Sequence, residues 1–293
     1  MSKILNLLIS IDDTDTLDSK GTGTIADEIR EVISKEYNGK CGYVTRHQLL
    51  IHKDIPYTSH NSCMCFSCNI EEADFELVKN TCLEYLIKES AIGSDPGIAV
   101  ADIEKVDGSK LVTYGFDAKR RILTKNEAYE IAEMSGVWLR EAGGTGDGVI
   151  GALAGIGLRI WGNDGDLKGK LATLKKETTY TVSEILATGY IEDVVDEVGE
   201  ALSKDESVYI LWKAKPTLNK NRLTLYVRRN EKGEWSSMEK NEMRSFLGNR
   251  VFMEGCEYFI EDVEEEQVDS SHSCFNCRYR RWQEKGLLCQ RKS

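Results

Sequence analysis

Ile9-Ser10-Ile11-Asp12-Asp13-Thr14-Asp15 joins an apolar run to three carboxylates within four residues. Apolar side chains are nearly continuous over residues 4–11, which predicts a central strand buried in a sheet. Gly21-Thr22-Gly23-Thr24 then opens an amphipathic segment. A buried strand, an acidic turn and a Gly-rich helix start are a common arrangement for holding a metal ion and phosphate. Aspartates are equally common in solvated turns that cap helices, so the stretch alone leaves both interpretations open.

The composition describes an ordinary globular protein. Its 293 residues are enough for two domains, and 41% of them are hydrophobic and 30% charged. No run reaches the roughly 20 apolar residues needed to cross a bilayer, and no signal peptide precedes the first strand. We therefore expect a cytoplasmic protein without a membrane partner. In that compartment the nine cysteines would be reduced thiols or metal ligands rather than a disulfide framework.

Charge is distributed unevenly along the chain. The formal net charge is -11, yet residues 272–293 carry six Lys or Arg against one acid, Glu284. An acidic body disfavours general affinity for nucleic acid, so the basic, aromatic tail is the segment to consider for RNA.

Hydrophobic periodicity predicts an α+β protein. Four segments have apolar residues at helical spacing, and these are residues 25–37, 75–86, 126–141 and 149–160. Two further runs read as strands, residues 42–51 and 62–70. Asp107-Gly108, between the apolar runs 97–106 and 110–116, predicts a β-hairpin.

The pattern after residue 165 is less regular. It predicts a short helical piece at 183–186, a helix over 191–202, and strands over 208–214 and 222–229. Asn219-Lys220-Asn221 would form the turn before the last strand.

A second glycine-rich segment, residues 143–148, precedes the helix predicted at 149–160. Glycines let backbone N–H groups approach a ligand, and the helix N-terminus favours negative charge. The segment is also consistent with a flexible turn before a tightly packed helix. Acidic residues that hold a cation and helix starts that hold phosphate are together typical of phosphoryl transfer, which favours a nucleotide site.

The histidines and cysteines of residues 47–68 give a weaker signal. Cys63 and Cys65 share one face of a strand and Cys68 faces the other, so buried thiols are favoured over a metal site. His60 lies in a polar loop, where it would contact a phosphate, carry a proton or remain a surface side chain.

The C-terminal cysteines have the spacing of a metal site. Cys274 and Cys277 form a knuckle, Cys289 supplies a third thiol, and His272 or Cys256 could supply the fourth ligand for Zn²⁺. A complete zinc ribbon would have two cysteine pairs. The surrounding arginines, with Tyr279 and Trp282, resemble RNA-binding segments, and a solvated tail that balances the neighbouring acidic run is the alternative.

Four motifs occur in the order typical of one family. They are Ile11-Asp12-Asp13-Thr14-Asp15, Ile55-Pro56-Tyr57, Asp95-Pro96-Gly97-Ile98, and the run of residues 148–157 that begins Gly148-Val149-Ile150-Gly151. In this order they resemble the archaeal tRNA(Ile) 2-agmatinylcytidine synthetases (TiaS), which use ATP and agmatine to modify a tRNA anticodon. The resemblance covers about residues 4–215.

The resemblance implies a domain organisation. Residues 1–165 would form a kinase-like α/β nucleotide-binding domain, residues 166–255 a ferredoxin-like domain, and residues 256–293 an acidic and then basic cysteine-bearing tail. The chain departs from the family in two places. Thr58-Ser59-His60-Asn61-Ser62 replaces a basic, glycine-containing stretch, and Asp147 stands where the family has a basic or neutral residue. No OB-fold or full zinc ribbon is evident.

The combined hypothesis is an ATP- and Mg²⁺-dependent enzyme. It would perform phosphoryl transfer or ligation on a tRNA or a nucleoside-like acceptor. Asp12, Asp13 and Asp15 would be catalytic and bind the metal. The nucleotide contacts would be Thr22, His60, Gly146 and Gly148, and tRNA would bind the basic tail. The alternatives are a non-catalytic nucleotide- or RNA-binding regulator on the same fold, and a structural protein organised by metal at Cys274, Cys277 and Cys289.

Overall fold

The chain forms two compact units, Met1–Lys168 and Gly169–Ser293. The structure, a computed structural model, describes residues 3–16, 18–52, 54–55, 61–168, 173–211, 214–238, 280–283 and 286–289, the last two ranges for their backbone only. Both units mix helices with sheet, which confirms the α+β class. Within these described ranges, none of the helices has the length and apolar content that crossing a bilayer demands.

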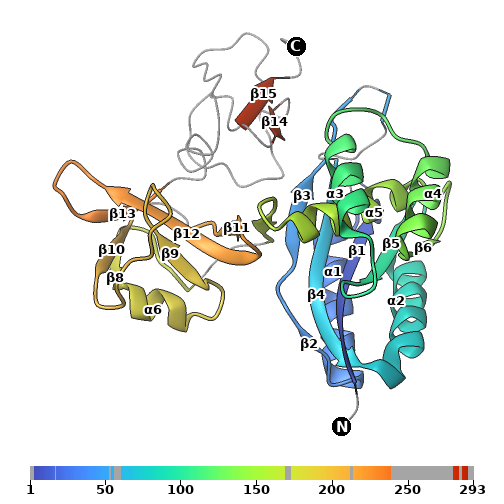
Figure 1. The fold of residues 1–293 in the computed structure, drawn as a ribbon, viewed down its shortest axis with the longest axis horizontal. Helices are drawn as coiled ribbons and strands as arrows, with labels where there is room; N and C mark the ends of the chain where they lie inside the picture. The colour runs from blue at the N-terminus through green and yellow to red at the C-terminus, as the bar shows by residue number, and fades with distance from the viewer. Residues whose placement is uncertain are drawn as a thin grey trace. The chain divides into compact units, whose positions relative to one another are not determined.

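The first unit is built on an antiparallel sheet with β1 (Ile4–Asp12) at its centre (Figure 1). β1 pairs with β4 (Ser62–Glu71) on one side and with β5 (Gly97–Asp102) on the other. β3 (Thr45–Gln48) and β7 (Asp166–Leu167) extend the sheet beyond β4, and β6 (Trp138–Glu141) extends it beyond β5. The short β2 (Lys40–Cys41) also pairs with β4. The predicted strands at 4–11 and 62–70 are therefore confirmed.

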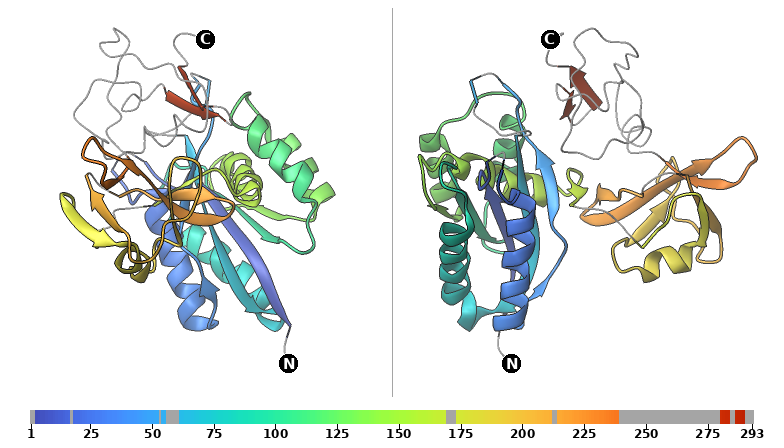
Figure 2. Two further views of the ribbon diagram at one scale, coloured as in Figure 1. Left: turned by 60° about the vertical axis from the view of Figure 1, so that its left-hand side comes forward. Right: turned by 180° about the vertical axis from the view of Figure 1, so that it is seen from behind.

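Helices cover both faces of this sheet (Figures 1 and 2). On one face, α1 (Thr22–Glu36) and α2 (Phe75–Glu89) pack on the odd-numbered residues of β1, from Leu5 to Ile11. On the other face lie α3 (Gly108–Asp117), α4 (Lys125–Ser135) and α5 (Gly148–Trp161). The even-numbered positions of β1, which include Ser10 and Asp12, face α5 because side chains alternate along a strand.

The order of elements in this unit defines its topology. β1, α1, β3, β4, α2 and β5 follow one another along the chain, and the four strands are arranged β5-β1-β4-β3 in the sheet. This is the split βαββαβ pattern of ferredoxin-like folds. The ferredoxin-like domain expected over residues 166–255 stays a prediction. The elements that follow β5 then cover the second face.

Close packing of α5 on β1 explains the small residues of this helix. A methyl group at Gly151 would lie 1.7 Å from Asp12 Oδ2, and one at Gly155 would lie 2.2 Å from Ser10 Oγ. Only glycine allows such an approach of helix to strand. The predicted helix over 149–160 and its close packing are thus confirmed.

The second unit has a sheet in the order β11-β12-β13-β10-β8. Its strands are β8 (Thr178–Thr181), β10 (Ser207–Ile210), β11 (Thr217–Asn219), β12 (Arg222–Arg229) and β13 (Trp235–Ser237), and β9 (Asp193–Val195) runs parallel to β12. Among its described residues this unit has a single helix, α6 (Val182–Ala187). β14 (Arg280–Gln283) and β15 (Gly286–Cys289) form a separate pair.

Two sequence predictions were wrong in secondary structure, those for 107–108 and 191–202, and a third, the helix over 126–141, was wrong only in where it ends. Asp107-Gly108 does not form a hairpin, because the Asp107 carboxylate accepts a hydrogen bond from Lys110 N at 3.4 Å and caps α3. The helix predicted over 126–141 ends at Gly136, whose φ of 78° allows the chain to turn into β6. Residues 191–202 form β9 and a turn at Asp196, whose Oδ1 accepts from Glu200 N at 2.8 Å.

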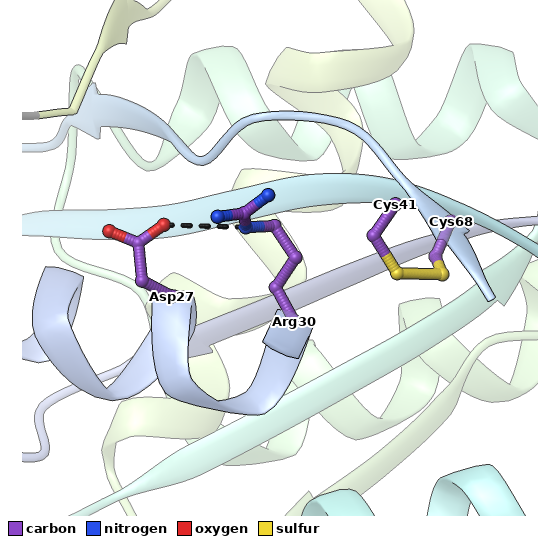
Figure 3. The surroundings of a disulfide bond; sticks show 4 residues. All are labelled: Asp27, Arg30, Cys41 and Cys68. Atoms are coloured by element: carbon purple, nitrogen blue, oxygen red, sulfur yellow. Dashed lines mark ion pairs between the residues drawn. A yellow bond between two sulfur atoms is a disulfide. The ribbon is translucent and has the colours of Figure 1, made fainter. Parts of the chain in front are cut away.

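One disulfide corrects the expectation of free thiols. Cys41 in β2 and Cys68 in β4 are opposite one another in the sheet and are bonded, while Cys63, Cys65 and Cys82 are free and buried. Figure 3 shows the bond beside α1, where Arg30 Nε lies 3.4 Å from Asp27 Oδ1. Cys41 and Cys68 are paired directly in the β2–β4 register, so their side chains lie on the same face of the sheet. Their separation of 27 residues in the sequence did not reveal this pairing.

Reducing this disulfide is expected to lower the free energy of unfolding by about 3 kcal/mol, because a cross-link over 27 residues restricts the unfolded chain. Urea denaturation with and without reductant measures the change. The Cys41→Ser variant should lose its sensitivity to reductant. A variant that kept the full sensitivity would show that another bond is responsible.

A buried ion pair fastens the end of α3 to β3 and to the segment after α5. Lys119 Nζ lies 2.6 Å from Asp164 Oδ2 and donates to the Gln48 carbonyl at 2.6 Å. The Lys119 side chain is only 3% exposed. Burial alone would raise the pKa of Asp164, but the charge of Lys119 and the contacts with His47 together outweigh it and hold that pKa at about 2.

Lys119→Met should therefore cost about 3 to 5 kcal/mol of unfolding free energy, because it leaves the Asp164 charge buried without its cation. The matched control is Lys110→Met, which removes an exposed pair with Asp107 and should cost less than about 1 kcal/mol. Urea denaturation at pH 7 compares the two variants. Equal losses would contradict the structural role of the buried pair.

Candidate functional site

A pocket of about 460 Å³ opens in the first unit where β1 ends. The first residues of three helices line it, Thr22 of α1, Lys125 of α4 and Gly148 of α5. Helix N-termini carry partial positive charge and unpaired N–H groups, so their convergence favours an anionic ligand. The volume is in the range of pockets that hold small molecules.

The three predicted aspartates all line this pocket. Asp12 is the last residue of β1 and is 9% exposed beneath α5. Asp13 follows with φ of 54°, a left-handed conformation that Asp tolerates better than most residues. Asp15 accepts a 2.6 Å hydrogen bond from the Thr22 hydroxyl, which also lies 3.0 Å from Thr14 Oγ1. The predicted contact Thr22 is thus held against the acidic turn.

Burial and neighbouring carboxylates raise the pKa of two of these aspartates, Asp12 and Asp13. Burial, then Asp95 and Asp15, raise the pKa of Asp13 to about 6. Burial and the charge of Asp13 raise the pKa of Asp12 well above its ordinary value. Asp147 also contributes to the field at Asp13 and lines the pocket. The site is therefore a concentration of negative charge that a bound cation would relieve.

Sequence reasoning did not assign Asp95 and Asp147 to the site. Asp95 stands just before β5, and its Oδ1 accepts a hydrogen bond from Thr145 N at 2.5 Å. Its position in the Asp95-Pro96-Gly97 motif was the available signal. Asp147 was noted only as a departure from the family. The fold brings both residues to the end of β1 because β5 and α5 flank that strand.

The glycine-rich segment serves the site differently from the prediction. Gly148 lines the pocket, but its N–H already donates to the Asp95 carbonyl at 2.8 Å. Gly146 is not among the residues of the pocket wall, and a methyl group there would lie 2.2 Å from Glu141 Oε2. The segment thus fixes the start of α5 against Asp95, which favours the turn interpretation for Gly146.

The remaining predicted residues lie outside the described part of the chain. This applies to His60, Cys274 and Cys277, and to the side chain of Cys289 in β15. Among the residues that the structure describes, no three His, Cys, Asp or Glu side chains are arranged to hold a metal ion by themselves. His47 is buried and lies 2.8 Å from Thr45 Oγ1, away from the pocket wall.

Comparisons with known proteins identify similar solved structures. No family model and no curated protein matches the chain. The complex of TiaS with an isoleucine tRNA and ATP is 24% identical with a TM-score of 0.47, and the complex with the tRNA, AMPCPP and agmatine is 24% identical with a TM-score of 0.45. A tRNA fluorescent labeling enzyme is 25% identical with a TM-score of 0.47.

Each of these matches covers 52% of this chain and 36% of the other chain. The chain therefore matches little more than a third of the length of those proteins. TiaS is also the family that the ordered motifs resemble.

Asp13→Asn should stabilise the ligand-free protein by about 1 to 2 kcal/mol at pH 7, after allowance for solvent screening. The folded pKa of about 6 lies above the ordinary 3.8, so the ionised carboxylate costs stability fully above pH 6. That cost falls as pH drops from 6 towards 3.8, and the gain from asparagine should disappear near pH 4. Urea denaturation at the two pH values measures it, and a gain independent of pH would contradict the electrostatic origin.

Proposed function

We propose that this pocket binds ATP with Mg²⁺, and that the chain is a TiaS-like enzyme. It would transfer a phosphoryl group or form a ligation product on a tRNA or a nucleoside-like acceptor. One observation carries the proposal: Asp12, Asp13 and Asp15 line a single 460 Å³ pocket together with the first residues of three helices. Acidic groups for a cation and helix N-termini for phosphates thus face the same space.

The donor set fits Mg²⁺. Magnesium prefers oxygen ligands and usually takes one or two carboxylates, with waters and substrate phosphates completing its shell. Asp13 and Asp15 would hold it, since both line the pocket and the pKa of Asp13 is raised by burial and by its acidic neighbours. When bound, the ion would neutralise charge on the phosphates.

The protein's own residues would position the nucleotide. The Thr22 hydroxyl orients the Asp15 carboxylate through its 2.6 Å hydrogen bond. Asp12 is fixed between β1 and α5, where the absence of a side chain at Gly151 leaves room for its carboxylate. Apolar side chains on the wall, among them Leu49, Ile122 and Ile150, would contact the base and exclude water.

The same proposal includes a tRNA as the acceptor and the basic C-terminal tail as the segment that contacts it. TiaS has been solved in complex with an isoleucine tRNA, and a tRNA is the acceptor to test first. The basic tail and a zinc ion at Cys274, Cys277 and Cys289 would serve that contact. Zinc analysis of the protein and of Cys277→Ser tests the metal. A cytoplasmic location stays a prediction.

A regulator that binds nucleotide without turnover is the second candidate. The segment Thr58-Ser59-His60-Asn61-Ser62, which has no Lys or Arg, favours it. An assay with radiolabelled ATP and bulk tRNA separates the two functions. Transfer of label to RNA excludes the regulator, whereas ATP binding without any turnover excludes the enzyme.

Calorimetric titration with ATP and Mg²⁺ should give binding to the wild type and a loss of at least about tenfold in Asp13→Ala, because a charged ligand contact is removed. The matched control is Asp18→Ala, an exposed aspartate of the same turn that does not line the pocket. It should bind as the wild type does. A wild type that fails to bind, or an Asp13→Ala variant with unchanged affinity, would refute the proposal.

A further inference from the structure

Part of the pocket wall comes from one short stretch of chain at the start of α4. The end of the α3–α4 connection and the first two residues of α4 contribute a continuous stretch to it, from Arg121 to Asn126. In the described lining, Arg121 and Lys125 are the two basic side chains, and they stand with the apolar Ile122 and Leu123. The sequence analysis assigned none of these residues to the site.

Ion pairs hold both basic groups in place. Arg121 donates to Asp117 Oδ2 at 3.0 Å and to Glu127 Oε1 at 2.7 Å, and its side chain is 48% exposed. Lys125 Nζ lies 3.2 Å from Glu141 Oε1 and also donates to the Thr145 carbonyl. A cation oriented by its neighbours loses less side-chain entropy when it meets a ligand.

The hydrogen bonds that hold Lys125 also connect this wall to the rest of the site. Lys125 contacts Thr145, whose own N–H donates to the carboxylate of Asp95. Thr124 accepts from Glu127 N, and the Glu127 carboxylate accepts from Thr124 N, so a capping box fixes the start of α4. The basic wall and the acidic turn are thus linked through the glycine-rich segment.

We infer that Arg121 and Lys125 bind the phosphate chain of the nucleotide, an inference that rests on the proposed ATP site. The acidic turn alone would repel a polyphosphate, and Mg²⁺ offsets only part of the charge of ATP. Arg121 and Lys125 on the pocket wall supply the positive charge that offsets the rest. The guanidinium of an arginine can also donate two parallel hydrogen bonds to a pair of phosphate oxygens. This assignment gives the pocket a basic group that the segment 58–62 does not contain.

The test compares ATP with adenosine at fixed Mg²⁺, using competition against a fluorescent ATP analogue. Arg121→Gln and Lys125→Met should each weaken ATP binding about 10- to 100-fold and leave adenosine within about twofold, because only ATP has phosphates to lose. Arg120→Gln is the matched control, since Arg120 lies 5.4 Å from the Phe116 ring and is not part of the wall. It should bind both ligands as the wild type does.

A further variant separates binding from folding. Asp117→Asn removes a partner of Arg121 but keeps the cation, so it should retain ATP affinity. The inference would be overturned if Arg121→Gln and Lys125→Met lost affinity equally for ATP and adenosine, or if they lost no affinity for ATP. In either case, ATP binding by the wild type would still uphold the proposed function. A wild type that bound neither ligand would overturn both.

Discussion

The contact between α5 and β1 is the constraint on which the first unit depends. Backbone of the helix approaches the strand so closely that a methyl group at Gly151 or Gly155 would overlap the side chains of Asp12 or Ser10. This contact buries one face of the sheet, fixes the Asp12 carboxylate, and brings the start of α5 to the end of β1. The pocket exists because the same contact that closes the core also places a helix N-terminus beside the acidic turn.

Charge in the pocket shows a conflict between stability and binding. Burial, together with the neighbouring carboxylates of Asp95, Asp15 and Asp147, raises the pKa of Asp13 to about 6. Such repulsion destabilises the ligand-free protein. Without ligand, Arg121 and Lys125 are paired with Asp117, Glu127 and Glu141, so they do not cancel this repulsion. A site of this kind is stabilised by the ligand that it binds.

The sequence correctly predicted those elements whose conformation is set by neighbouring residues in the chain. The strand at 4–11, the helix at 149–160 and the turn at Lys220, where φ is positive, are readable because periodicity and turn chemistry are local. Asp107-Gly108 misled because the same pair suits a hairpin and a helix cap, and only tertiary packing distinguishes them. Asp95 comes close to Asp13, and Arg121 and Lys125 line the same pocket, only because of the tertiary fold, which one sequence does not reveal.

The position of the ferredoxin-like core has a consequence for synthesis. Its strands and helices lie within residues 4–102, and the elements that cover the second face follow in the chain. Because domains fold from the N-terminus during translation, the sheet can form before α5 has left the ribosome. Leu8, Cys63 and Ala101 would then be exposed on an open face until the later helices arrive. This chain is therefore expected to need protection from aggregation during that interval, and to acquire its pocket only after residue 161 has emerged.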